Sequence, residues 1–296
     1  MNKTEILKNT YKVLSSISPT MSSKLMYRIT VKKKLNLKNP KLFNEKLMWL
    51  KLNLYKNNPL ITECVDKYRV REYIKRCGCS ELLNELIGVY DSVDEIDFSK
   101  LPDKFVLKCN HGAGYNILCK NKNELNINET KQTLKKWLKE DYWKRCAEIN
   151  YKKVPKKIIC EKFLENENKE DLEDYKIYCF NGIPQFVMIC VGRNAKQRTK
   201  YYFMNKEWKI MKINPAGIET PENFKIEKPK CIDEMFEYAQ TLSKPFPFVR
   251  VDFYCVKDKT IFGELTFTPA GCIDTNYIGN AQEMLGNMID LSEYIR

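Results

Sequence analysis

The stretch RVDFYCVKDKTIFGELTFT, residues 250–268, decides the fold class of this chain. Two runs rich in β-branched and aromatic residues flank the dipeptide Lys257-Asp258. Such runs, separated by a short polar turn, predict two antiparallel strands over residues 248–256 and 259–267. The C-terminal part of the chain is therefore expected to contain an antiparallel sheet.

Two carboxylates interrupt these apolar strands: Asp252 lies in the first and Glu264 in the second. Burying a carboxylate costs free energy unless a cation or hydrogen-bond donors compensate its charge. A Mg²⁺ ion, with ATP phosphates completing its coordination shell, would provide that compensation. Arg250 and Thr266 each lie two positions from one carboxylate and point to the same face. A metal site and a metal-free ion pair with Arg250 both remain open.

A glycine-rich loop follows another predicted strand. Residues 105–109 form a short apolar run that carries Lys108, and the loop leads into a second run over residues 115–119. Glycines let backbone N–H groups approach a phosphate closely, and a lysine on a strand offers a fixed positive charge. The loop lacks the Gly-Lys-Ser/Thr ending of a P-loop, so a tight hairpin turn also explains its glycines. The candidate phosphate-binding residues of the loop are His111, Gly112, Ala113 and Gly114.

Two further segments could complete a nucleotide site. The strand predicted over residues 157–164 ends with backbone groups that could meet the edge of an adenine while an apolar side chain packs on its face. Asp174 and Lys176 open the next strand. A surface charge pair in the first segment and a cross-strand ion pair in the second are the alternatives. The adenine-binding candidates are Glu161, Lys162, Phe163 and Leu164.

The order of these patterns predicts an α+β protein. Residues 1–65 show helical periodicity and form an expected N-terminal helical extension. Residues 66–165 alternate helix and strand, with a helix predicted over 129–148. The polar segment 165–171 is the candidate boundary to the last part, residues 166–296, where antiparallel strands dominate and Asn181-Gly182 predicts a hairpin.

Positive charge is concentrated in residues 1–60, which contain thirteen Lys/Arg against Glu5 and Glu45, in a chain of net charge +13. A solvated helical face explains this pattern. So does docking to an anionic membrane surface or polymer, because Leu25, Met26 and Ile29 accompany the lysines, as in an interfacial helix. No sequence motif for reading RNA or DNA is present, so a nucleic acid is not an expected partner.

Twelve cysteines are scattered along the chain, which has a single histidine and no Cys-x-x-Cys pair. This pattern favours free buried thiols over a zinc site or a disulfide scaffold. No run approaches the roughly 20 apolar residues of a membrane span, and the N-terminus does not resemble a secretory signal. We expect a cytoplasmic protein, with peripheral contact at the inner face of the membrane as a hypothesis.

Four runs resemble the TupA-like (teichuronopeptide-biosynthesis) branch of the ATP-grasp superfamily: FNEKLMWLK (43–51), LPDKFVLKCNHGAG (101–114), RVDFY (250–254) and GELTFTPAG (263–271). The resemblance begins near residue 40 and covers nearly all of the chain that follows. It implies an ATP-grasp fold, in which two α+β subdomains sandwich the nucleotide, with ATP and Mg²⁺ as cofactors.

The same resemblance implies roles for individual residues. Lys108 and Lys176 would hold phosphates, Asp252 and Glu264 would bind Mg²⁺, and Arg250 would steady an acylphosphate. Many ATP-grasp enzymes have Glu-x-Asn where this chain has Glu264-Leu265-Thr266, so Thr266 is a weaker candidate for the third metal ligand than Asp252 and Glu264 are for the first two.

The implied reaction is that of an ATP-dependent carboxylate-amine ligase. The implied substrates are a uronic acid or glutamyl carboxylate on a surface glycan or its precursor, and an amino acid or small amine. Arg193 and Arg198, with Lys196 and Lys200, could bind such an anion, although a solvated loop explains them equally. A glycosyltransferase, for which no Asp-x-Asp motif is present, and a non-catalytic polymer-binding protein are the alternatives.

Overall fold

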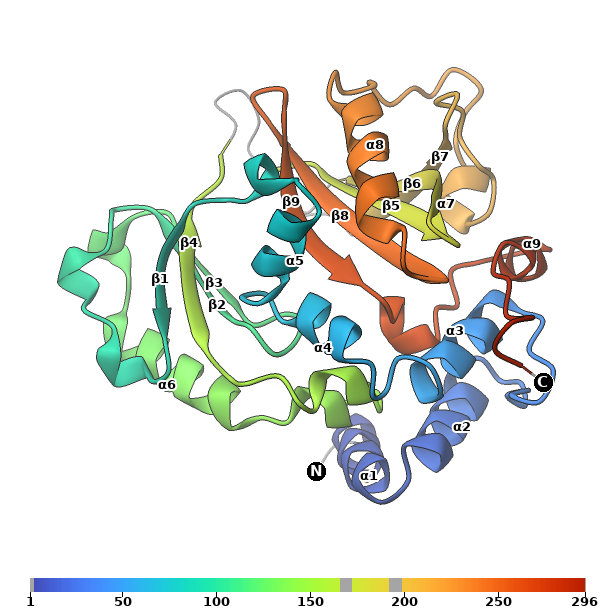
Figure 1. Ribbon diagram of the computed structural model, residues 1–296, viewed down its shortest axis with the longest axis horizontal. Coiled ribbons are helices and arrows are strands. Elements are labelled where there is room, and N and C mark those ends of the chain that lie inside the picture. The colour runs from blue at the N-terminus through green and yellow to red at the C-terminus, as the bar shows by residue number, and fades with distance from the viewer. Residues whose placement is uncertain (1–2, 166–171, 192–198, 296) are drawn as a thin grey trace.

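The computed structural model describes residues 3–165, 172–191 and 199–295, and arranges them as two sheets with helices between and around them (Figure 1). This mixture confirms the predicted α+β class. The helices are α1 (Lys3–Ile17), α2 (Pro19–Thr30), α3 (Phe43–Leu52), α4 (Pro59–Val65), α5 (Val70–Arg76), α6 (Ile127–Lys139), α7 (Pro215–Ile218), α8 (Ile232–Ser243) and α9 (Ala281–Asn287). The strands are β1 (Leu86–Tyr90), β2 (Phe105–Cys109), β3 (Asn116–Cys119), β4 (Ile158–Lys162), β5 (Asp174–Phe180), β6 (Ile183–Val191), β7 (Lys200–Asn205), β8 (Phe248–Val256) and β9 (Lys259–Thr266).

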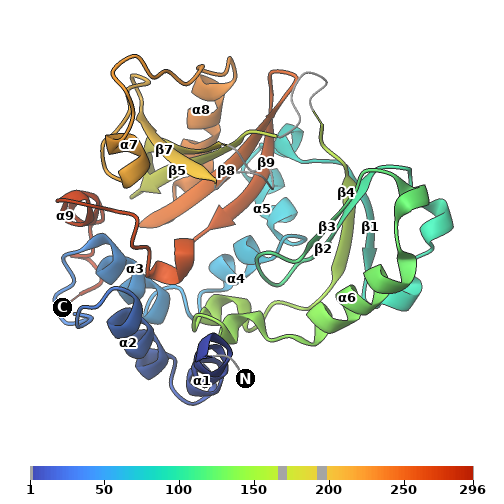
Figure 2. The same ribbon diagram turned by 180° about the vertical axis from the view of Figure 1, so that it is seen from behind.

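The first four strands form an antiparallel sheet in the order β1-β4-β2-β3, which we call the small sheet. Helix α6 lies along it, as two opposite views show (Figures 1 and 2). Leu134 of α6 is fully buried in one apolar cluster with Phe105 and Leu107 of β2. The small sheet thus has a core of its own, held against α6 by apolar burial.

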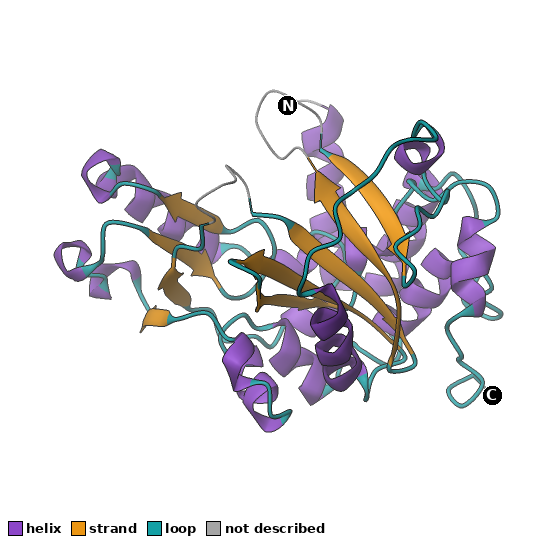
Figure 3. Cartoon of the chain, turned by 90° about the horizontal axis from the view of Figure 1, so that it is seen from above, coloured by secondary structure: helices purple, strands orange, loops and turns teal. Residues whose placement is uncertain are grey.

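The remaining strands form an antiparallel sheet in the order β7-β6-β5-β8-β9, the large sheet, whose strands lie side by side in Figure 3. Its hairpins turn at Asn181-Gly182 and at Lys257-Asp258, and all four residues have positive φ angles between 49° and 75°. Left-handed backbone at both central positions matches the right-handed twist of the flanking strands. Both hairpins predicted from the sequence are confirmed.

The two faces of the large sheet differ in chemistry. One face presents apolar residues such as Val249 and Val251 of β8 and is covered by α8, with Ala239 of α8 fully buried. On the other face, Phe43 of α3 packs edge-on against Phe248 at one end of β8, with ring centroids 5.3 Å apart. Further along that face the aromatic residues give way to charged ones. The charged part faces the small sheet across α4 and α5 (Figure 1).

Lys51 of α3 is completely buried, which is unusual for an ammonium group. Its Nζ donates hydrogen bonds to the backbone carbonyls of Cys146, at 2.9 Å, and Gly271, at 3.2 Å. One side chain therefore ties α3 to two segments that are distant in sequence.

The predicted long helix over residues 129–148 is wrong in its second half, because α6 ends at Lys139. Glu140 has extended backbone angles (φ −74°, ψ 138°), and its carboxylate accepts hydrogen bonds from Tyr115, at 3.0 Å, and Arg145, at 2.6 Å. These tertiary contacts turn the chain where the sequence has neither glycine nor proline. Tyr142, which falls within the predicted helix, lies in a short 3-10 turn instead.

Most of the predicted boundary segment, residues 166–171, lies outside the described residues, and the division into three parts stays a prediction. Core residues of α3, α4 and α5 share one apolar cluster with the large sheet. No helix in the described part of the chain combines the length and apolar character that crossing a bilayer requires.

Candidate active site

A carboxylate cluster lies on the charged face of the large sheet. Asp252 of β8 is the direct cross-strand partner of Glu264 of β9 on one side and of Lys176 of β5 on the other. Arg250 and Thr266 form the next cross-strand pair. The structure therefore brings five of the predicted site residues together through strand register alone, as the alternation of side chains requires.

Asp252 is bonded to two cations. Arg250 donates from Nε to Oδ1 and from Nη2 to Oδ2, both at 2.7 Å, and Lys176 Nζ lies 2.6 Å from Oδ2. The side chains of Asp252, Arg250 and Lys176 are 3%, 11% and 12% exposed. This bidentate arrangement is the ion pair that the sequence left open as an alternative to a metal.

Thr266 links Arg250 to the second carboxylate. Its hydroxyl accepts a hydrogen bond from Arg250 Nη2, at 3.1 Å, and donates one to Glu264 Oε1, at 2.8 Å. Glu264 has a side chain that is 37% exposed and is the more accessible of the two carboxylates. In this structure Thr266 acts as an orienting hydroxyl between the two groups.

The two carboxylates titrate differently. Burial raises the pKa of Asp252 above its ordinary value even though Arg250 and Lys176 pull it down. Burial acts in the same direction on Glu264, but Lys67, Lys176 and Arg250 outweigh it and lower the pKa of Glu264 to about 2. Glu264 is therefore an anion at neutral pH, the state in which a carboxylate binds a cation.

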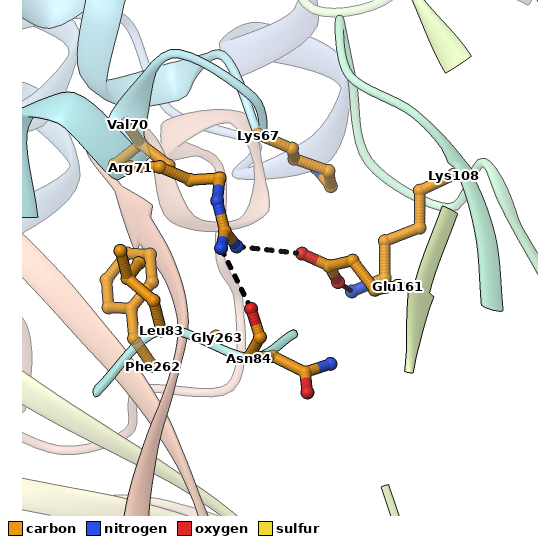
Figure 4. Close-up of a pocket in the computed structure, with 9 residues that line it drawn as sticks. All are labelled: Lys67, Val70, Arg71, Leu83, Asn84, Lys108, Glu161, Phe262 and Gly263. Atoms are coloured by element: carbon orange, nitrogen blue, oxygen red, sulfur yellow. Dashed lines mark hydrogen bonds and ion pairs between the residues drawn. The ribbon is translucent and has the colours of Figure 1, made fainter. Parts of the chain in front are cut away.

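A second charged group lies on the small sheet and the adjacent α5. It consists of Lys108, Glu161 and Arg71, and we call it the lysine cluster. Lys108 Nζ is 2.5 Å from Glu161 Oε2, and Arg71 Nη1 is 3.6 Å from Glu161 Oε1. Arg71 also donates to the carbonyl of Asn84 at 2.9 Å. Figure 4 shows Arg71, Glu161 and Lys108 converging on one space.

Lys67 connects the two clusters. Its Nζ donates to the carbonyl of Gly112, at 2.7 Å, and lies 3.7 Å from Glu264 Oε2. The neighbouring Asp66 is buried and accepts a hydrogen bond from the Asn110 amide at 2.7 Å. This bond anchors the Lys67 segment to the base of the glycine loop, so that Lys67 lies between the loop and Glu264.

A pocket opens between the two sheets at this point (Figure 4). Cations and Glu161 form one side of it, and apolar groups form another, which is the mixed lining typical of small-molecule sites. Its lining residues are Lys67, Val70, Arg71, Leu83, Asn84, Lys108, Glu161, Phe262 and Gly263.

The two glycines of the loop are required for different structural reasons. A Cβ on Gly112 would lie 2.4 Å from Cγ of Tyr142, so the packing of that ring requires a glycine. Gly114 has a φ of +79° and open space around it, so the turn requires it. The hairpin turn therefore explains Gly114, and packing against Tyr142 explains Gly112. Only Ala113 and Gly114 of the loop candidates are exposed enough to meet a ligand.

His111 points into the protein. Its side chain is 2% exposed, its Nε2 lies 3.2 Å from the carbonyl of Trp137, and its ring lies 5.3 Å from that of Tyr115. Burial lowers the pKa of His111 to about 4, with the charge of Lys156 acting in the same direction. The structure therefore places this imidazole, neutral at pH 7, in the core beneath the loop.

The predicted adenine segment has mixed placement. Glu161 lines the pocket, while Lys162 is exposed and Phe163 and Leu164 are half-buried. The backbone of Lys162 is already engaged, because its N–H donates to Glu85 at 3.0 Å and its carbonyl accepts from Asn84 at 2.8 Å. An adenine edge that used Lys162 would have to replace these bonds.

The residues fit a metal-nucleotide complex better than a metal alone. No group of three or more His, Cys, Asp or Glu side chains suitable for a metal occurs among the described residues. Two carboxylates leave most positions of an octahedral Mg²⁺ to phosphate oxygens and water, as is usual for nucleotide-bound magnesium. The predicted anion-binding residues Arg193 and Arg198, with Lys196, lie outside the described residues.

Sequence reasoning missed three residues of the pocket: Lys67 in the turn before α5, Arg71 of α5, and Asn84 shortly before β1. One signal was available, because Lys67 and Arg71 are four positions apart in a helix-like run and share a face. The partners of Lys67 and Arg71 lie on β9 and β4, far away in the sequence. The local sequence therefore does not indicate which residues that helix face contacts.

Two sheets that bring carboxylates and lysines to one pocket define a protein able to hold a polyanionic ligand and a cation between two α+β halves. A model of the TupA-like ATP-grasp family matches residues 45–290, and the chain belongs to that family. The predicted family, the ATP-grasp fold and the cofactors ATP and Mg²⁺ agree with this assignment.

Solved structures with a similar fold share little sequence with the chain. They include a D-alanine–D-alanine ligase from Bacillus anthracis complexed with ATP (14% identity, 77% of this chain and 65% of that one, TM-score 0.46). An L-amino acid ligase from Bacillus licheniformis matches with 12% identity, 83% and 55% coverage and a TM-score of 0.49. The third is the biotin carboxylase domain of Hydrogenobacter thermophilus 2-oxoglutarate carboxylase, with MgADP and bicarbonate. It has 14% identity, the match covers 80% of this chain and 47% of that one, and the TM-score is 0.48.

These likenesses carry no functional argument, and the chain spans 66% or less of the length of the first solved structures it matches. No curated protein matches the chain.

Proposed function

We propose that the protein is an ADP-forming carboxylate-amine ligase. In that reaction the γ-phosphoryl group of ATP passes to a carboxylate oxygen, and an amine nitrogen then attacks the acyl carbon and expels phosphate. The observation that carries the proposal is the position of Lys67. It joins the glycine loop to Glu264, and so connects a candidate phosphate site to a candidate metal site beside the pocket that Lys67 lines.

The charges of the pocket suit this chemistry. Phosphoryl and acyl transfer both depend on positioned positive charge where negative charge develops. In the proposed enzyme Lys108 and Lys176 contact the α- and β-phosphates, and Ala113 and Gly114 cover the γ-phosphate with backbone N–H groups. Arg250, fixed by Asp252 and Thr266, steadies the oxygens of the acylphosphate.

Mg²⁺ supplies neutralisation of the phosphate charge when it is bound. Glu264 is the exposed anionic ligand for it, and Asp252 is the second. Thr266 keeps Glu264 oriented through its hydroxyl. Because Asp252 is bonded to Arg250 and Lys176 in this structure, loading a metal requires one of those bonds to lengthen.

For the adenine we propose the apolar side of the pocket, where Val70, Leu83 and Phe262 lie together. Glu161, Phe163 and Leu164 belong to the adjoining strand end. Lys162 would contact the adenine only if its carbonyl exchanged the hydrogen bond from Asn84 for one from the adenine.

We further propose that the carboxylate is a uronic acid or glutamyl group of a capsule or other surface polysaccharide, and the amine an amino acid or small amine. This proposal rests on the resemblance to teichuronopeptide-biosynthesis proteins. A lipid-linked form of such a substrate lies at an anionic membrane surface, which the basic residues 1–60 suit. Arg193 and Arg198 remain candidates for binding the sugar anion.

The test is release of ADP and phosphate by the purified protein with Mg-ATP and pairs of uronates, glutamyl compounds and amines. We expect release that needs both substrates and falls at least about a hundredfold in Lys67→Met, because the developing charge loses a buried cation. Lys100→Met, at an exposed lysine away from the pocket, is the matched control. Turnover of a sugar nucleotide without ATP would establish a glycosyltransferase instead, and polymer binding that survives Asp252→Asn without any turnover would establish a binding protein.

A further inference from the structure

Helices α1 and α2 form a hairpin at the edge of the molecule, away from both sheets (Figures 1 and 2). Ser15 and Ser22 bond to each other at 2.9 Å in the buried contact between the helices, and Ser18 caps the start of α2. Met26 of α2, predicted at an interface with the lipid, is buried at 1% exposure. The outward surface of the hairpin is therefore made by other residues.

Helix α1 carries an apolar stripe that the fold does not use. Ile6, Val13 and Ile17 are 48%, 61% and 76% exposed, and their spacing places them on one helix face together with Thr10. The Thr10 hydroxyl donates to the carbonyl of Ile6 at 2.9 Å, so it is satisfied within the helix. A helix that needs one apolar face for the fold thus carries a second one toward solvent.

The stripe continues around the tip of the hairpin onto α2. Met21 is 59% exposed and Ile29 is 43% exposed. Ile17 and Met21 flank the Ser18-Pro19 turn, so two exposed apolar side chains lie where the hairpin projects. Exposed apolar groups gathered in this way mark an interaction surface.

Positive charge borders the apolar edge. Residues 1–34 contain eight Lys/Arg and a single acidic residue, Glu5. Lys24 and Arg28 of α2 are exposed, and so are Lys32, Lys33 and Lys34 directly after it. On the α1 side, Val13 also lines an open groove that contains three lysines and two acidic residues, Lys12, Lys139, Lys144, Glu140 and Asp141.

We propose that the α1–α2 hairpin is a membrane-docking element that inserts Ile17 and Met21 into the interface of an anionic bilayer. Lysines at the level of the phosphates and apolar side chains just below them are what such an interface accepts. A second copy of the chain would bring two strongly basic edges together, and a nucleic acid offers no apolar phase for the tip. Helix α3 is part of the core and is not available to a membrane. The segment proposed to contact the membrane is therefore residues 1–34, not the whole of residues 1–60.

The docking surface rests on the proposed function for its purpose, but its test is independent of catalysis. The full chain is sedimented with phosphatidylcholine vesicles that contain none or about 30% phosphatidylserine. We expect binding to the anionic vesicles, weakened by added salt. The double variant Ile17→Gln/Met21→Gln should weaken that binding about tenfold or more through lost apolar burial without a change of charge.

Ile218→Gln, at a side chain that is 52% exposed on α7, is the matched control and should bind as the unmodified chain does. Asp252→Asn should also keep vesicle binding, so that loss of turnover and loss of docking are separate results. Equal binding by the double variant, or no binding to anionic vesicles by the unmodified chain, would overturn the proposal. A dimer in solution that the double variant abolishes, without any vesicle binding, would assign the edge to a second copy.

Discussion

The carboxylate cluster on the large sheet and the lysine cluster, which lines the pocket, are built in opposite ways. The carboxylate cluster lies in the middle of adjacent strands, and register fixes every member of it. The lysine cluster gathers side chains from β2, β4 and the region of α5, and its exposed neighbours Ala113 and Gly114 belong to a turn.

This difference indicates a division of roles. The large sheet offers a preorganised set of charges, in which Asp252 holds Arg250 and Lys176 in place before any ligand arrives. Preorganised charge avoids reorganisation at the moment of reaction. The lysine cluster instead combines side chains from separate elements, β2, β4 and α5, which can move relative to one another when a ligand binds. Breaking an ion pair should therefore have unequal consequences in the two clusters.

The largest effect is expected from Asp252→Ala. It removes the bidentate partner of the buried Arg250 and leaves Lys176 with Asp174 alone, 2.6 Å away, so the free energy of unfolding should fall by about 3 kcal/mol. Glu161→Ala in the lysine cluster should cost less, about 1–2 kcal/mol, because Lys108 is 23% exposed and can reach water while Arg71 keeps its bond to the Asn84 carbonyl. Urea denaturation of both variants at pH 7 checks the comparison. Equal losses would show that the two clusters are not built differently.

A smaller effect separates the two loop glycines. In Gly112→Ala the new Cβ would overlap the ring of Tyr142 close to its attachment point, which should cost about 3 kcal/mol of stability. Gly114→Ala meets no neighbour and should cost about 1 kcal/mol for its left-handed backbone. Thermal denaturation of the two variants measures the difference. A larger loss in Gly114→Ala than in Gly112→Ala would contradict the packing explanation.

The smallest effect concerns pH and the only histidine of the chain. The unfolded chain takes up a proton on His111 near pH 6.5, whereas the folded protein resists protonation until about pH 4. Protonation therefore favours unfolding, and this contribution to stability falls as the pH drops below 6.5. At pH 5 the loss should be about 2 kcal/mol.

His111→Gln removes that group, so the variant should lose less stability than the unmodified protein between pH 7 and pH 5. Denaturant titrations at the two pH values give the comparison. The same pH dependence in both proteins would place His111 in contact with water.

Much of the large sheet could be predicted from the sequence. Alternation and the Lys257-Asp258 turn fix which side chains share a face of the β8–β9 hairpin, and the apolar partners of α8 follow from the same pattern. This is why Arg250, Asp252 and Glu264 could be placed together before their distances were known.

The sequence could not show which side chains contact one another across different helices and strands. Whether Asp252 pairs with a metal or with Arg250 depends on side-chain geometry, and the end of α6 depends on Tyr115 and Arg145 meeting Glu140. His111 looked like a phosphate ligand because it stands beside glycines. Its direction, however, is set by the aromatic residues beneath the loop.

Lys51 has a consequence for the order in which the chain folds. Its two carbonyl partners lie 95 and 220 residues further along the sequence, so the site of its ammonium group is complete only when those segments are present. Closing such long loops is slow compared with forming the helix that carries the lysine. During synthesis, the Lys51 ammonium group of α3 therefore lacks its second carbonyl partner until residue 271 has left the ribosome. The last third of the chain decides when the first third becomes stable.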